Sequence, residues 1–117
     1  WNNEPDVNKE LIEMVDIATP HIAGYSFQGK QNGTASAVRA VARQFDILGL
    51  YHFFPTNDLP EHQPIRLDLK GKNQGEITAV FQYNYPIFTD DFMFRMDPDN
   101  FERMRSEYQY RREIYVD

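Results

Sequence analysis

The spacing of hydrophobic residues predicts one long helix in the first half of the chain. Between residues 26 and 47 the apolar positions recur at helical spacing on one face, whereas Arg39 and Arg43 lie off that face. Ser26 is suited to the N-cap of this helix, and Gly49 fits the position that stops it. The apolar positions of the stripe are Ala35, Val38, Val41, Ala42, Phe45 and Leu48.

Two glycines, Gly29 and Gly33, lie one turn apart inside this predicted helix. Each lowers the intrinsic stability of a helix by about 1 kcal/mol relative to alanine. We therefore expect a close-packing reason for glycine at these positions.

Shorter elements are predicted on either side of the long helix. Alternation of Val15 and Ile17 indicates a short strand that Pro20 ends. A second strand is indicated over 65–69 by alternating apolar and charged residues. The other predicted elements are a short helix over 8–15, a helix over 76–85 and a closing strand over 112–116.

The clearest helix signal lies at residues 97–110. Asp97 is suited to the N-cap, Pro98 to the first helical position, and Asp99 adds negative charge to the first turn. The preceding segment 92–96 is apolar on both faces, which indicates contact with a partner surface. Residues 51–64, which contain three prolines, are the best candidate for a linker and a domain boundary.

Composition excludes several classes of protein. The chain has 117 residues and a net charge of −6, which argues against a nucleic-acid binder. Cysteine is absent, so there is neither a disulfide framework nor a thiolate site. No apolar run has the roughly 20 residues of a membrane span, and the first ten residues do not form a signal peptide. We expect a cytoplasmic protein, and a chain that is a piece of a longer one.

Only one histidine, His21, is a candidate catalytic residue. The three histidines lack the spacing and cysteine support of a metal site, so no metal is predicted. His21 follows Pro20 and precedes small residues in "ATPHIAGYS", an arrangement suited to presenting a side chain to a ligand. A carboxylate such as Glu4 could raise the basicity of the imidazole, but seventeen positions separate the two residues. From spacing alone, a histidine that follows a strand is more often a hydrogen-bonded packing residue than a member of such a pair.

Three quoted stretches carry a resemblance to a known family. They are "NEP" at 3–5, "LIEMVDIATPHIAGYSFQGKQNGT" at 11–34 and "FERMRSEYQYRREIYV" at 101–116. The first two resemble the end of the nucleotide-binding domain of D-isomer-specific 2-hydroxyacid dehydrogenases. The tail resembles the C-terminal dimerisation domain of the vitamin B6 biosynthetic branch of that family, whose substrate is phosphorylated.

The resemblance implies roles for four residues, and guanidinium chemistry adds two candidate arginines. His21 would be the general acid/base and Glu4 the carboxylate that holds its imidazole. Gly24 would lie against the NAD cofactor, and Tyr25 would contact the substrate. Arg111 and Arg112 are either a solvated pair or the source of a guanidinium that reaches the substrate phosphate in the partner subunit of a homodimer.

The resemblance also implies an α+β fold in three parts. Residues 1–25 would end a Rossmann-like domain with its last strand and loop, and 26–48 would be a helix returning to the substrate-binding lid. Residues 49–117 would form a dimerisation domain of helices on a short antiparallel sheet. The family's cofactor loop and catalytic arginine would lie upstream of Trp1, so the chain alone is expected to be inactive. The alternative is a non-catalytic interaction module derived from this family.

Overall fold

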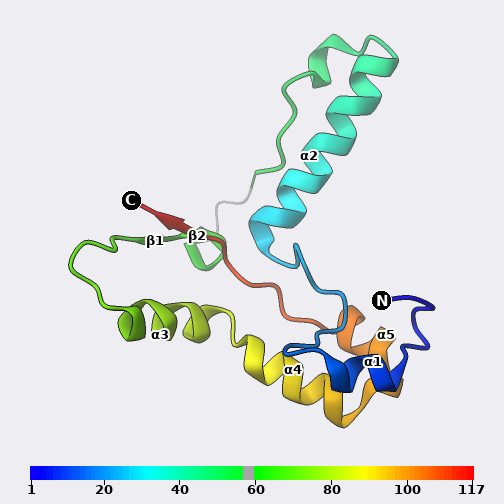
Figure 1. The fold of residues 1–117 in the computed structure, drawn as a ribbon. Helices are drawn as coiled ribbons and strands as arrows, with labels where there is room; N and C mark the ends of the chain where they lie inside the picture. The colour runs from blue at the N-terminus through cyan, green and yellow to red at the C-terminus, as the bar shows by residue number, and fades with distance from the viewer. Residues whose placement is uncertain (57–59) are drawn as a thin grey trace. The chain divides into compact units, whose positions relative to one another are not determined.

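The computed structural model describes residues 1–56 and 60–117 (Figure 1). The chain forms two compact units, each made from two stretches that are distant in sequence. Unit 1 consists of Trp1–Ala23 and Gly71–Gln109, and unit 2 consists of Gly24–Lys70 and Tyr110–Asp117. Among the described residues, no helix is both long and apolar enough to cross a membrane. The predicted division into three parts stays a prediction.

Unit 1 is helical. Its helices are α1 (Lys9–Met14), α3 (Gln74–Asn84), α4 (Ile87–Met96) and α5 (Phe101–Ser106), with a 3₁₀ turn at Pro98–Asn100. Asn8 caps α1 by accepting hydrogen bonds from the amides of Glu10 and Leu11. Asn73 and Glu76 form a reciprocal capping box at the start of α3. These side chains satisfy amides that a helix start leaves unpaired.

A small aromatic core holds unit 1 together. The ring of Phe94 is fully buried and lies 5.7 Å from the ring of Trp1 and 5.9 Å from that of Phe101, measured between centroids. Val7, Ile12 and Ala18 complete this cluster of buried residues. The core therefore joins the N-terminal segment to α4 and α5.

Unit 2 contains the long helix and a two-stranded sheet. Helix α2 runs over Phe27–Gln44, β1 over Ile65–Leu67 and β2 over Ile114–Val116. The Ser26 side chain caps α2 by accepting from the amide of Gly29, as predicted. The predicted strands near 65 and 114 are confirmed.

The sheet is parallel, so the predicted antiparallel arrangement is wrong. Ile65 pairs with Ile114 and Leu67 with Val116 in parallel register. Parallel strands need a long crossover connection. Here the chain supplies it, because residues 68–113 lie between the two strands and include all of 71–109 from unit 1. An α+β description of the chain stands, whereas the Rossmann-like remnant stays a prediction.

Two local predictions near the ends of the chain are wrong. No strand forms at 15–19, where the amide of Ala18 donates instead to the carboxylate of Asp91 at 2.6 Å. The helix predicted over 97–110 is a 3₁₀ turn followed by α5, which ends at Ser106. The Asp97 side chain caps no amide and accepts a hydrogen bond from the Asn100 side chain. Residues in this part therefore take side-chain partners that local sequence patterns do not reveal.

The two glycines of α2 have different environments. A Cβ on Gly29 would lie 2.7 Å from the carbonyl oxygen of Gly24 and equally close to the Ser26 hydroxyl, so glycine is required there. A Cβ on Gly33 would have no atom within 4 Å. The expected close packing is thus present at Gly29 and absent at Gly33.

This contrast predicts opposite effects of one substitution. Gly33→Ala should stabilise the chain by about 0.5–1 kcal/mol, because alanine is the better helix former and meets no neighbour. Gly29→Ala should destabilise it by about 1–3 kcal/mol, because the added methyl forces the Gly24 carbonyl aside. Urea unfolding followed by circular dichroism measures both. Equal effects of the two substitutions would contradict the packing argument.

Candidate functional site

The structure brings Glu4 and His21 together within unit 1. The Nδ1 atom of His21 lies 2.8 Å from each carboxylate oxygen of Glu4. A carboxylate only accepts, so Nδ1–H is the donor and Nε2 is the nitrogen available for proton exchange. The imidazole is more than half exposed, at 56% of its side-chain surface, which gives a ligand access to it. This pairing is one that spacing alone left open.

Hydrogen bonds lower the pKa of Glu4 from its ordinary value of 4.5. The α-amino group of Trp1, which lies 2.9 Å from the Glu4 carboxylate, is the largest cause, and His21 is the next. A carboxyl whose pKa is lowered by folding contributes stability above its unfolded value and loses it as the pH falls through the folded value. The contacts of the Glu4 carboxylate are therefore lost as the pH falls into the acid range.

His21 has a backbone conformation that few residues with side chains adopt. Its φ is 55°, in the left-handed region. Such conformations cost roughly 1–3 kcal/mol and persist where surrounding contacts fix them. Here the amide of His21 donates to the Thr19 carbonyl at 2.9 Å, and the indole of Trp1 donates to the same carbonyl at 2.7 Å. Strain of this kind is often found at active sites, which makes the loop a candidate site on structural grounds.

Gly24 and Tyr25 follow this loop and belong to unit 2. Gly24 has a φ of 78°, and a Cβ added to it would have no atom within 4 Å. The left-handed conformation, rather than crowding, is therefore what favours glycine there. The Tyr25 ring makes an edge contact with Tyr110 at 5.8 Å, and the ammonium of Lys30 lies 3.8 Å from its centroid.

The backbone of unit 2 places Arg111 beside Tyr25. The Arg111 amide donates to the Tyr25 carbonyl at 3.1 Å, and its own carbonyl accepts from the Phe27 amide at 2.8 Å. The guanidinium of Arg112 donates to the carbonyl of Gln63. Two residues predicted to contact substrate, Tyr25 and Arg111, are thus held together, although they are far apart in sequence.

Sequence reasoning missed Lys30 as a charged neighbour of Tyr25. The signal was present in the quoted motif "HIAGYSFQGK", which ends on this lysine. It lies one turn into α2, so its ammonium can reach back over the aromatic ring.

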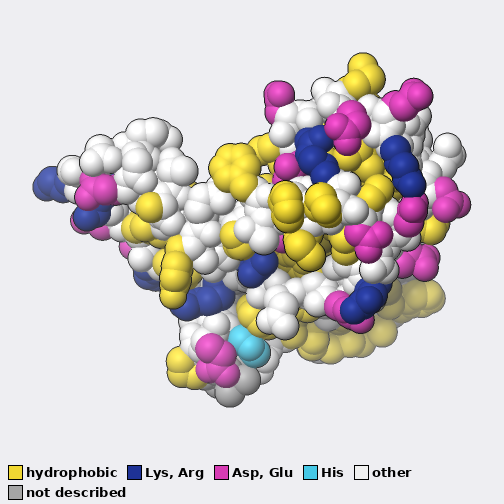
Figure 2. Space-filling view, turned by 90° about the horizontal axis from the view of Figure 1, so that it is seen from below, with side chains coloured by type: hydrophobic (Ala, Val, Ile, Leu, Met, Phe, Trp, Pro, Cys, Tyr) yellow, Lys and Arg dark blue, Asp and Glu magenta, His cyan; other side chains and the backbone are white. Residues whose placement is uncertain are grey.

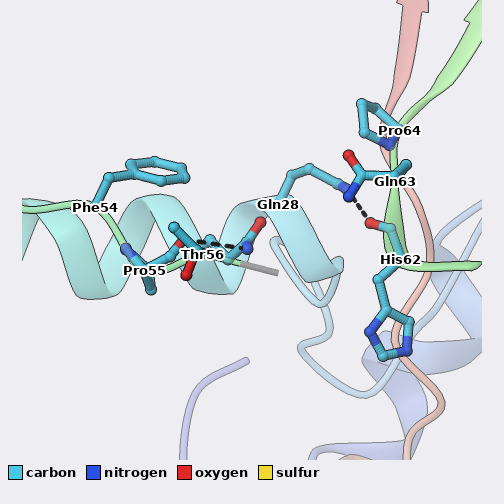
Figure 3. Close-up of a pocket in the computed structure, with 8 residues that line it drawn as sticks. Gln28, Phe54, Pro55, Thr56, His62, Gln63 and Pro64 are labelled. Carbon is cyan, nitrogen blue, oxygen red and sulfur yellow. Dashed lines mark hydrogen bonds between the residues drawn. The ribbon is translucent and has the colours of Figure 1, made fainter. Parts of the chain in front are cut away.

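A separate cavity of about 370 Å³ lies in unit 2 (Figure 3). Gln28 closes one side by donating to the carbonyl of His62, and Gln31 donates to the carbonyl of Pro55 at 3.3 Å. The other lining residues are Phe54, Thr56, Gln63 and Pro64. None of the six residues assigned from the sequence lines it, so it is not the predicted site. Among residues 1–56 and 60–117, no three His, Asp or Glu side chains are placed to hold a metal ion.

The chain is similar to several curated proteins that share one name. No family model matches the chain. The chain is 37% identical over 119 residues to an erythronate-4-phosphate dehydrogenase of Psychromonas ingrahamii, with 97% of this chain and 30% of that protein aligned. It is 34% identical over 113 residues to the enzyme of that name from Bacteroides thetaiotaomicron and 37% identical over 122 residues to that from Tolumonas auensis. These alignments cover 97% of this chain and 30% and 31% of those proteins.

All three relatives are named as dehydrogenases. Over 97% of its length the chain is similar to a portion of proteins named erythronate-4-phosphate dehydrogenase. It spans about 30% of the length of the relatives it matches. The resemblance inferred from the sequence is therefore confirmed.

Proposed function

We propose that this chain is the C-terminal part of an enzyme that oxidises 4-phospho-D-erythronate to the corresponding 2-oxo acid, with NAD as the acceptor, in pyridoxal phosphate biosynthesis. The observation that carries the proposal is the Glu4–His21 pair, with Nδ1 held by both carboxylate oxygens and the imidazole accessible. A histidine oriented by a carboxylate is the usual form of a general base near neutral pH. The relatives' names supply the substrate.

In this reaction the chain moves a proton. Oxidation of a 2-hydroxy acid removes a hydride from C2 and a proton from the hydroxyl group. The Nε2 atom of His21 takes that proton, and Glu4 stabilises the imidazolium that results. In a longer chain the nitrogen of Trp1 would be a peptide amide, which leaves the His21 imidazole as the side-chain hydrogen-bond partner of Glu4.

One feature of the backbone, at Gly24, is suited to the close approach of a nicotinamide cofactor. Gly24 lacks a side chain in a left-handed backbone segment, and the space that a Cβ would occupy contains no protein atom within 4 Å. A cofactor can approach the main chain closely at such a position. NAD, when bound, supplies the hydride acceptor. The parts that bind its phosphates are proposed to lie outside this chain, which by itself should be inactive.

The substrate's phosphate calls for cations. Arg111 and Arg112 are proposed to supply one, because a guanidinium matches the geometry of a phosphate. Tyr25, which is bound to the Arg111 backbone, is proposed as a further substrate contact.

A homodimer is proposed as the assembly. Helix α4 exposes Phe88, Phe92 and Met96 at 61%, 61% and 69% of their surfaces, and their spacing places them on one side of the helix. Figure 2 shows hydrophobic side chains among the charged ones on the face of the molecule that it draws. Sedimentation should show a dimer at tens of micromolar, and Phe92→Asp should make it monomeric. A monomeric parent chain would refute the proposal.

The function is tested on the full-length protein that carries this segment. Production of NADH should require 4-phospho-D-erythronate and should be much slower with unphosphorylated D-erythronate. Arg111→Ala or Arg112→Ala should raise KM for the phosphorylated substrate; if neither does, the phosphate role is wrong. Absence of turnover with this substrate would favour the alternative, a non-catalytic dimerisation module.

A further inference from the structure

An ion pair on α4 contacts the segment that leads to His21. Asp91 and Arg95 lie one turn apart, with the Arg95 Nε atom 2.9 Å from the Asp91 carboxylate. Both side chains are largely buried, at 24% exposed for Arg95 and 18% for Asp91. An exposed pair of this spacing contributes little, so the reason for burying this one lies in its other contacts.

Those other contacts are all with the backbone of the N-terminal segment. Arg95 donates to the carbonyls of Ile12 and Val15 at 2.6 and 2.7 Å. Asp91 accepts from the amide of Ala18 at 2.6 Å, and Ala18 is fully buried. Three backbone groups within 12–18 thus have their partners on a helix more than seventy residues away in sequence.

The segment needs such partners because it has no regular structure of its own. Helix α1 has six residues, too few to be stable in isolation, and its last carbonyls have no partner within the helix. The strand that would have given the backbone N–H and C=O groups of residues 15–19 hydrogen-bond partners does not form. The hydrogen bonds from α4 take the place of a strand neighbour and of a C-cap.

We propose that Asp91 and Arg95 are positioning residues for His21, holding residues 12–18 so that the following turn keeps His21 in its left-handed conformation and in contact with Glu4. The proposal rests on the acid/base role proposed above. Its physical basis is the short chain of hydrogen bonds from the Asp91–Arg95 pair to the imidazole of His21. Ala18 is held by Asp91, the carbonyl of the next residue, Thr19, is fixed by Trp1, and that same carbonyl receives the amide of His21.

Two variants of Asp91 separate positioning from packing. Asp91→Ala leaves the buried Ala18 amide without its acceptor, and kcat of the full-length enzyme should fall by about 10- to 100-fold, as small displacements of a catalytic group do. Asp91→Asn keeps an oxygen in the same place and should retain most of kcat. The matched control is Glu107→Ala, which removes an exposed ion pair of the same spacing between Arg103 of α5 and Glu107, the C-cap of that helix. It should change neither kcat nor KM.

A readout independent of turnover is the carboxyl of Glu4 in the 117-residue chain. Its pKa is lowered in part by His21, so carbon NMR titration should show this pKa moving up toward the ordinary value in Asp91→Ala and staying low in Asp91→Asn and Glu107→Ala. A purely structural role would lower the melting temperature and leave both this titration and the kcat of the folded protein unchanged. That result would overturn the proposal.

Two further comparisons keep the test decisive. If Asp91→Ala does not fold, Arg95→Lys replaces it, because one ammonium cannot reproduce the donors to both carbonyls. It should raise the pKa of Glu4 and lower kcat, and unchanged values of both would refute positioning. If His21→Asn leaves turnover intact, the acid/base role is wrong. A rise in the Glu4 pKa in Asp91→Ala would still support the positioning role of Asp91 and Arg95.

Discussion

Replacing His21 by Asn in the full-length protein that carries this segment should lower kcat of the proposed reaction by about 10²–10⁴-fold, the usual contribution of general acid–base catalysis. Asparagine is the appropriate substitution because it tolerates the left-handed backbone that His21 adopts, so the loop keeps its conformation. The His21 side chain is more than half exposed, so the melting temperature should change little. The loss is therefore chemical, and steady-state kinetics with an NAD binding measurement will separate it from a loss of cofactor affinity.

The matched control is His52→Asn, which removes another exposed imidazole and should leave kcat unchanged. Glu4→Gln should have a milder effect on kcat, because the imidazole remains. It should move the pH–rate profile to lower pH, since a neutral amide stabilises an imidazolium less than a carboxylate does. A kcat for His21→Asn within a factor of about two of the parent would contradict the acid/base role, because general acid–base catalysis contributes far more.

The sequence predicts the elements whose signals are local. The long helix begins after Ser26 as expected, because one residue supplies the cap and a repeating apolar face supplies the rest. The short strands near 65 and 114 are found from alternation. Their parallel pairing is not, because it depends on where the intervening 46 residues run, and no pattern within either strand records that path.

Predictions fail where a side chain distant in sequence replaces a local partner. Alternation of Val15 and Ile17 suggested a strand, but the backbone there is satisfied by Asp91 and Arg95 of α4. Helix α4 itself was not assigned, because the segment 92–96 is apolar on both faces and shows no periodicity. One face of α4 buries Phe94, and the other exposes Phe92 and Met96. Because all three residues are apolar, the sequence does not show which of the two faces is buried.

The candidate site was found from a motif rather than from spacing. Glu4 and His21 are seventeen positions apart, so only the family resemblance pointed to their contact, which the structure then contains. Asp91 and Arg95 had no such signal. Their partners are backbone groups 73 to 83 positions away, and a backbone group imposes no residue type that a sequence could reveal.

The largest loss of stability is expected from Phe94→Ala. Phe94 is fully buried between the rings of Trp1 and Phe101, and truncation of such a residue costs about 3–5 kcal/mol. A domain of this size has only about 5–15 kcal/mol of stability in total, and the buried cluster of unit 1 has five residues. We therefore expect this variant to lose a large share of the free energy of unfolding of unit 1 and to unfold at a clearly lower urea concentration. Trp1 is the one tryptophan of the chain, so its fluorescence reports directly on this core.

The control for this prediction is Tyr83→Ala on the adjacent helix α3, where the aromatic side chain is 91% exposed. Its midpoint of urea unfolding should stay close to that of the parent, because exposed substitutions usually change stability by no more than about 0.5 kcal/mol. Loss of the Phe94 ring also frees the Trp1 indole, which holds the Thr19 carbonyl next to the His21 turn. At temperatures where Phe94→Ala is still folded, kcat should therefore fall as well. A variant with parent-like fluorescence, urea midpoint and kcat would show that this cluster does not hold the N-terminal segment on α4.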